Sequence, residues 1–144
     1  MSPVDILVNN AGIVPMLSLR EGSGQEIDRI IQVNITAQFH VTRTFPPGMI
    51  ERKRGHVVGI ASISALHPVS GAVIYSSTKA AMNNMMIALS EEMRQEGNEF
   101  VKCTSILPYL VTTRKDIVET ANFRFPFIYF TGIHSQHCCR WDTS

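Results

Sequence analysis

The residues of this 144-residue chain that could carry out chemistry lie between positions 62 and 79. Tyr75 precedes Lys79 by four residues, and on a helix this spacing stacks the two side chains on one face, about one turn apart. A free tyrosine has a pKa of about 10, and a neighbouring cation favours the phenolate and lowers that pKa. Ser62 follows an apolar run and is expected at a strand end, where its hydroxyl can hydrogen-bond a reacting oxygen. The trio predicts acid–base chemistry, although Tyr-x-x-x-Lys alone also occurs in helices without a catalytic role.

A second group of polar and small residues precedes this trio. The apolar run over 4–9 is followed by Asn10-Ala11-Gly12, and small residues at the carboxyl end of a parallel strand let the backbone approach a ligand. Asn34 lies further on, inside a helical pattern with apolar neighbours, and a buried amide needs hydrogen-bond partners. A structural role stays open for both: a simple strand-to-loop turn after the apolar run, and a structural hydrogen bond for Asn34.

In order and spacing, these motifs resemble the short-chain dehydrogenase/reductase family, whose Asn-Asn-Ala-Gly, helical Asn, Ser and Tyr-x-x-x-Lys all occur here. The resemblance implies an oxidoreductase that interconverts an alcohol and a carbonyl with NAD or NADP. Tyr75 would be the general acid/base, Lys79 would lower its pKa and bind the nicotinamide ribose, and Ser62 would orient the substrate oxygen. Asn34 would hold a water that links Lys79 to solvent. Asn10, Ala11 and Gly12 would lie near the adenosine ribose.

The segment after the third predicted strand extends this resemblance. The family pattern Pro-Gly-x-x-x-Thr, which contacts the nicotinamide carboxamide, is matched by Pro108, Val111 and Thr113. Tyr109 replaces the glycine, which is similar to the retinol and 17β-hydroxysteroid dehydrogenase branch and implies a lipophilic alcohol or ketone, such as a retinoid or steroid. Ser64 is expected beside Ser62 and Tyr109 in the substrate pocket, with the loop over 66–72 as one wall.

Alternating strands and helices must position these residues. Continuous apolar or β-branched runs predict buried strands of a parallel sheet over 4–9, 55–61 and 100–107. Three- and four-residue apolar steps predict long helices over 25–50 and 75–97, the first kinked by Pro46 and Pro47 near its end. The fold class is α/β: a doubly wound, Rossmann-like parallel sheet with three α/β/α layers, incomplete in this chain.

The second predicted helix carries a stripe of methionines, which are expected in the core or at an interface: Met82, Met85, Met86 and Met93. In the family the two long helices commonly form a four-helix dimer interface. The resemblance therefore implies a homodimer.

Family members usually begin with a strand and a Thr-Gly-x-x-x-Gly-x-Gly turn for the cofactor pyrophosphate. That turn does not occur here, so the chain resembles a fragment that starts at the family's fourth strand. We expect a partial NAD(P)-binding domain over 1–124 and a divergent tail over 125–144. Two alternatives to an active enzyme stay open: an inactive remnant with an exposed strand edge, and a dimerising partner of a full-length relative.

Composition argues against several other classes. A net charge of +1 with scattered Lys and Arg lacks the basic footprint of a nucleic-acid-binding protein. No run of about twenty apolar residues predicts a membrane span. The three cysteines do not form a disulfide framework, and the His134-x-x-His137-Cys138-Cys139 spacing matches no ordinary zinc site. The default expectation is a cytoplasmic protein, whereas the resemblance leaves an endoplasmic reticulum or lipid-droplet membrane open for a longer parent.

Overall fold

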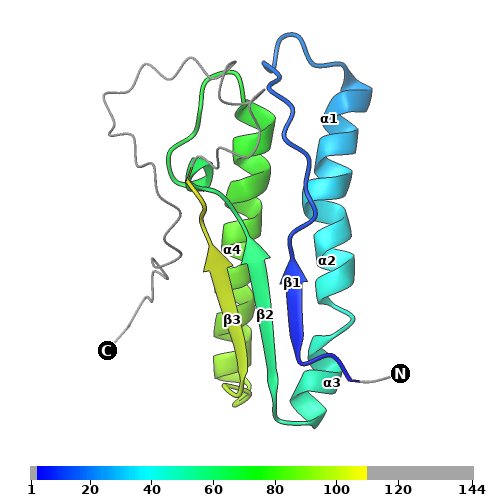
Figure 1. Cartoon of the computed structure of the whole chain (residues 1–144), viewed down its shortest axis with the longest axis vertical. Helices are drawn as coiled ribbons and strands as arrows, with labels where there is room; N and C mark the ends of the chain where they lie inside the picture. The colour runs from blue at the N-terminus through cyan, green and yellow to red at the C-terminus, as the bar shows by residue number, and fades with distance from the viewer. Residues whose placement is uncertain (1–2, 110–144) are drawn as a thin grey trace. The chain divides into compact units, whose positions relative to one another are not determined.

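The computed structural model describes residues 3–109 of the chain, which contain one parallel sheet and its helices (Figure 1). The three strands have the order β1-β2-β3 and are all parallel. In chain order the elements are β1 (Ile6–Asn9), α1 (Gly24–Ile31), the π-helical η1 (Gln32–Thr36), α2 (Ala37–Thr42), α3 (Pro46–Glu51), β2 (Gly55–Ile60), the 3-10 turn η2 (Ile63–Ala65), α4 (Val73–Gln95) and β3 (Val101–Ile106). The predicted parallel α/β sheet is confirmed.

The first predicted helix differs from expectation at both its centre and its end. It begins at a capping box, in which the Ser23 hydroxyl and the Glu26 carboxylate each bind the other residue's backbone N–H. The helix then continues through η1 and α2 without a break and ends at Thr42. The prediction that the prolines kink this helix was wrong: Pro46 starts the separate helix α3, because a proline fits the first turn of a helix, where its missing N–H has no partner to lose.

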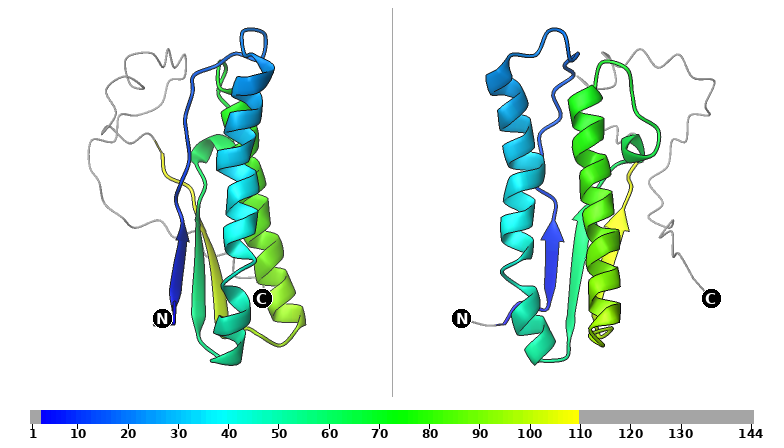
Figure 2. Two further views of the ribbon diagram at one scale, coloured as in Figure 1. Left: turned by 90° about the vertical axis from the view of Figure 1, so that its right-hand side faces the viewer. Right: turned by 180° about the vertical axis from the view of Figure 1, so that it is seen from behind.

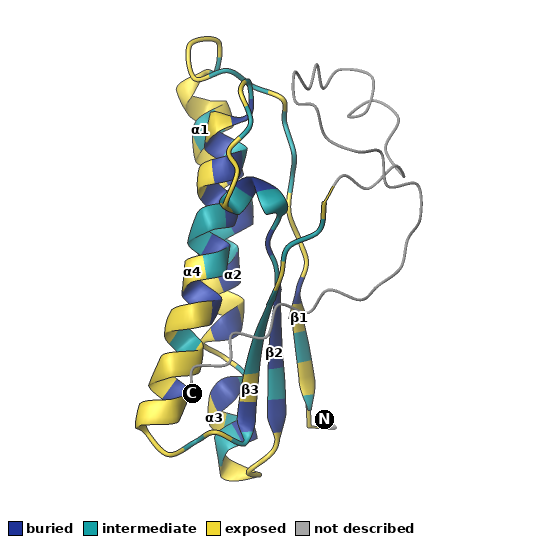
Figure 3. Ribbon diagram, turned by 90° about the vertical axis from the view of Figure 1, so that its left-hand side faces the viewer, coloured by how far each residue is buried: buried dark blue, intermediate teal, exposed yellow. Residues whose placement is uncertain are grey.

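Helices cover one face of the sheet (Figures 2 and 3). The long helix α4 packs on β2 and β3, while α2 packs on β1. Within residues 3–109 the other face carries no helix, so the described part contains two of the three layers of the predicted, incomplete sheet. Ile6 and Val8 of β1 are 62% and 53% exposed, and Ile106 of β3 is 43% exposed. The prediction of a fully buried first strand was therefore wrong, because only one of its faces is covered.

Methionines fill the space between the sheet and α4. The predicted stripe lies in the core: Met82, Met85, Met86 and Met93 are buried together with Met49 and Val57. Gly59 of β2 allows this packing, since a Cβ there would lie 2.5 Å from Cγ of Met86. The absence of a side chain at Gly59 thus permits the close packing of α4 on β2.

The described residues contain neither a helix long and apolar enough to cross a bilayer nor a cluster of His, Cys, Asp and Glu suited to a metal ion. The predicted tail and its histidine–cysteine group lie outside this part of the chain.

Candidate active site

The residues predicted to do chemistry converge beyond the carboxyl ends of β1 and β2. Ser62 follows β2 directly and precedes η2, whereas Tyr75 and Lys79 occupy the first two turns of α4. The loop after β1 approaches from the other side, so that a Cβ on Gly12 would lie 3.4 Å from Oδ1 of Asn34 and 3.5 Å from Nζ of Lys79. Because Gly12 has no side chain, space remains beside the ammonium group at this edge of the sheet.

Lys79 is buried, with its amine held at a fixed point. Its Nζ donates a hydrogen bond to the backbone oxygen of Ile60 at 2.7 Å, and it lies 5.7 Å from the centre of the Tyr75 ring. Burial lowers the pKa of Lys79, since desolvation disfavours the charged form. The predicted shared helix face of Tyr75 and Lys79 is confirmed.

The Tyr75 phenol is half-buried, and its pKa has the opposite direction from the one predicted. Desolvation raises the pKa of Tyr75, and the nearby Ser62 side chain offsets part of this rise. The net rise follows because loss of hydration around the phenolate outweighs the stabilising contacts. Lys79 is not among the causes of this shift, so a lowering of the pKa by Lys79 stays a prediction.

Ser62 is held by its neighbour in the 3-10 turn. Its Oγ accepts a hydrogen bond from the backbone N–H of Ser64 at 3.2 Å, which leaves the Ser62 hydroxyl proton free to be donated elsewhere. The side chain of Ser64 is buried, and its Oγ has no hydrogen-bond partner among the described residues. Contact between Ser64 and a substrate stays a prediction.

Asn34 lies in η1, where its buried amide forms hydrogen bonds with the loop after β1 and with α4. Oδ1 accepts from the backbone N–H of Ile13 at 2.8 Å, and Nδ2 donates to the backbone oxygen of Ile13 at 2.9 Å. Nδ2 also donates to Oγ1 of Thr78 at 3.1 Å. The structural hydrogen bonds that burial requires are thus present. The water relay stays a prediction.

The remaining predicted site residues fall into three groups. Asn10, Ala11 and Gly12 are exposed at the end of β1, where a ligand can reach them. Tyr109 is exposed and Pro108 is partly buried. Val111 and Thr113 lie outside the described residues.

Sequence reasoning missed two polar residues that support the site. Thr78 bonds Asn34, and Gln38 in α2 donates from Nε2 to the backbone oxygen of Ala11 at 2.7 Å. Both are buried. The available signal was a polar residue within an otherwise buried helical stripe, because such a residue must find partners.

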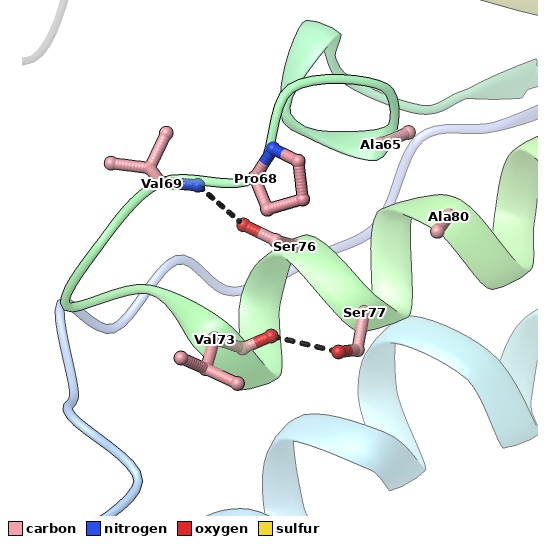
Figure 4. Close-up of a pocket in the computed structure, with 7 residues that line it drawn as sticks. All are labelled: Ala65, Pro68, Val69, Val73, Ser76, Ser77 and Ala80. Atoms are coloured by element: carbon pink, nitrogen blue, oxygen red, sulfur yellow. Dashed lines mark hydrogen bonds between the residues drawn. The ribbon is translucent and has the colours of Figure 1, made fainter.

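A small cavity of about 330 Å³ lies beside the start of α4 and is lined by Ala65, Pro68, Val69, Val73, Ser76, Ser77 and Ala80 (Figure 4). Ser76 accepts a hydrogen bond from the Val69 N–H at 3.3 Å. Neither Tyr75 nor Lys79 lines this cavity. The loop over 66–72 thus packs on α4, while its role as a wall of the substrate pocket stays a prediction.

Comparison with known proteins agrees with this geometry. A family model described as short chain dehydrogenase matches residues 1–122. Retinol dehydrogenase 10 of Homo sapiens is 36% identical over 110 residues, which are 76% of this chain and 32% of that protein. The chain thus spans about a third of this relative's length.

Solved structures show the same similarity. A metagenomic short-chain oxidoreductase in complex with NADP has a TM-score of 0.67 and 34% identity, covering 74% of this chain and 47% of that one. The closed form of serine dehydrogenase complexed with NADP+ has a TM-score of 0.69 and 33% identity, covering 74% and 42%. With a family model matched over most of its length, the chain belongs to the short-chain dehydrogenase/reductase family.

Proposed function

We propose that this chain carries the proton-transfer half of the active site of an NAD(P)-dependent oxidoreductase that interconverts an alcohol and a carbonyl. The observation that carries the proposal is the buried Lys79 amine, held by Ile60 within 5.7 Å of the Tyr75 ring centre. A buried lysine is costly unless it has a partner. This one lies next to a phenol at a strand end, where open α/β sheets bind ligands.

The residues present fit a nicotinamide cofactor. An added Cβ at Gly12 would fill space 3.5 Å from the Lys79 amine, and residues 10–12 are exposed. Lys79 would hold the ribose hydroxyls, and residues 10–12 would lie along the adenosine ribose. When bound, the cofactor supplies the hydride. Family membership and the two NADP-bound similar structures support NAD or NADP without distinguishing them.

Proton transfer would be the task of Tyr75. Its raised pKa keeps the phenol protonated near neutrality, which suits donation of that proton to a carbonyl oxygen during reduction. Ser62, whose Oγ already accepts from the Ser64 N–H, would donate a hydrogen bond to the same oxygen and orient it. In the reverse direction the phenolate form of Tyr75 would take the proton from the alcohol. Asn34 would complete the path from Lys79 to water.

For the substrate we propose a lipophilic alcohol or ketone. The exposed aromatic ring of Tyr109 follows the strand that ends beside the site, and one similar protein is named a retinol dehydrogenase. Tyr109 and Ser64 would contact the substrate.

The long helices would form a homodimer. Their outward faces carry exposed apolar side chains, namely Phe39, Val41, Val73 and Ile87. The second candidate function, a non-catalytic remnant or dimerising partner, is favoured by one observation. Within residues 3–109 the outer edge of β1 has no paired strand.

A nucleotide titration tests the proposal. The purified chain is titrated with NADH and NADPH while nucleotide fluorescence is followed, and retinal and a keto-steroid are then offered as substrates. We expect Lys79→Ala to weaken nucleotide binding about 10- to 100-fold, because a charged hydrogen bond contributes about 1.5–3 kcal/mol. Tyr75→Phe should retain binding and abolish turnover.

Lys102→Ala is the matched control, since Lys102 is an exposed lysine on β3 and its loss should leave binding unchanged. A chain that is folded by circular dichroism yet binds neither nucleotide would contradict the enzymatic proposal and support the non-catalytic one.

A further inference from the structure

The first turn of α4 carries Tyr75 but has no side-chain cap. Its N-cap residue is Ala72, with φ −134° and ψ 37°, and no side chain bonds the free N–H groups of this turn. Gly71 before it has a positive φ of 77°. By contrast, α1 starts with a complete capping box. Helix ends fray when their first N–H groups lack partners, so the turn that holds the phenol needs another restraint.

Thr78 supplies a restraint from inside the helix. Its side chain is 1% exposed, and its hydroxyl donates to the backbone oxygen of Tyr75 at 2.7 Å. A hydroxyl has one proton, so the remaining contact, with Nδ2 of Asn34 at 3.1 Å, must be one in which Thr78 accepts. The donor and the acceptor are therefore fixed in both hydrogen bonds of the Thr78 hydroxyl, which together bridge Tyr75 and Asn34.

The far end of the bridge is anchored in a different element. Asn34 forms paired hydrogen bonds with both backbone groups of Ile13, which belongs to the loop after β1. Asn34 itself lies in the π-helical η1, a helix form that often occurs at functional sites. One continuous chain of hydrogen bonds thus runs from this loop through Asn34 and Thr78 to the carbonyl group of Tyr75.

We propose that Thr78 is a positioning residue for Tyr75, an inference that rests on the proposed function of that phenol. The hydroxyl fixes the first turn of α4 against η1, so that the phenol stays within reach of Ser62. The same bridge places Lys79, the next residue along the helix, over the end of β2. Because Thr78 is only 1% exposed, it would touch neither the cofactor nor the substrate and would act through Tyr75.

A spectroscopic measurement tests this without requiring turnover. The chain is labelled with ¹³C at Cζ of tyrosine, and the Tyr75 signal, identified with Tyr75→Phe, reports the hydrogen bonding of the phenol at neutral pH. We expect Thr78→Val to move this signal at least half as far as Ser62→Ala does. Thr78→Ser, which restores the hydroxyl, should return the signal close to its original position.

Thr42→Val is the matched control. Thr42 is also a buried helical threonine, and its hydroxyl accepts from Nδ2 of Asn9 at 2.6 Å, away from α4. Its loss should leave the Tyr75 signal unchanged. If Thr78→Val does not fold, Thr78→Ala and Thr78→Ser are compared in the same way. A Tyr75 signal that is equal in the folded valine or alanine variant and in Thr78→Ser would overturn the proposal.

Kinetics separates this inference from the proposed function. Where turnover is measurable, Thr78→Val should lower kcat about 10- to 100-fold, since a small misplacement of a catalytic group has effects of this size. The Kd for nucleotide should stay within about twofold, because Thr78 does not touch the cofactor. Absence of nucleotide binding in the unmodified chain would refute the enzymatic function, while the response of the Tyr75 signal would still decide the role of Thr78.

Discussion

The two faces of the sheet are built from similar residues but have different surroundings. On the covered face Leu7, Val57 and Cys103 lie in register beneath the helices, and Val57 is fully buried. On the bare face Ile6 and Val8 alternate with them along β1 and are largely exposed. Side chains of a strand alternate between faces, so one apolar run supplies both surfaces.

This difference shows that an apolar strand sequence does not by itself tell whether helices cover both faces of the sheet. Strands that are apolar on both faces are typical of parallel sheets with helices on each side. Within residues 3–109 one of these layers is present, formed by α1 to α4. The residues of the covered face should therefore carry most of the stability of this unit, and the following predictions test that asymmetry in order of expected size.

The largest effect on stability is expected from removing a buried side chain that packs on the covered face. Met86→Ala should lower the free energy of unfolding by about 2–4 kcal/mol, because Met86 is almost completely buried and its removal leaves a cavity. Ile6→Ala, on the bare face, should cost less than about 1 kcal/mol. Urea denaturation followed by circular dichroism measures both variants. Equal losses would contradict the asymmetry.

The second prediction concerns thiol chemistry on the two faces. Burial raises the pKa of the Cys103 thiol from 9.0 to about 11. The thiolate is the reactive form, so near pH 8 Cys103 should react with a disulfide reagent about 100-fold more slowly than a thiol with pKa 9. The rate should rise with pH up to about pH 11. The measurement uses a chain in which Cys138 and Cys139 are replaced by serine.

Lys102→Cys in a chain without the native thiols gives the comparison, since position 102 is exposed on the bare face. A similar rate at both positions would show that Cys103 is not shielded. The raised pKa also has a consequence for stability. Between pH 9 and 11 the unfolded thiol releases its proton before the folded one, so the contribution of Cys103 to stability falls as the pH rises through this window.

The smallest effect is expected from a polar substitution on the bare face. Val8→Thr should change the free energy of unfolding by less than about 0.5 kcal/mol, since the new hydroxyl stays hydrated. The matched variant Val57→Thr buries the same hydroxyl on the covered face and should cost about 1–3 kcal/mol. Thermal or urea unfolding of both variants compares the loss of stability on the two faces for the same Val→Thr substitution. A costly Val8→Thr would mean that the face at β1 is shielded.

The sequence by itself determined the three strands, the presence of the two long helices and the family. Apolar runs and helical spacing predicted the strands and the long helices, and the predicted spacing of Tyr75 and Lys79 put both on one helix face, as the structure confirms. These features are local, because periodicity and short-range sterics act between residues close in the chain. The order of the motifs around Asn34, Ser62 and Tyr75 was sufficient to indicate the family that the comparison then confirmed.

The tertiary structure alone decided how these residues interact. The π-helical segment at Asn34, the role of Thr78 and the bare face of β1 depend on contacts between residues far apart in the chain. The direction of the Tyr75 pKa has the same origin: a four-residue spacing shows that a cation is near, but the burial that raises this pKa depends on the elements packed around the phenol. Desolvation depends on everything that surrounds a group, and no local pattern in the sequence contains that sum.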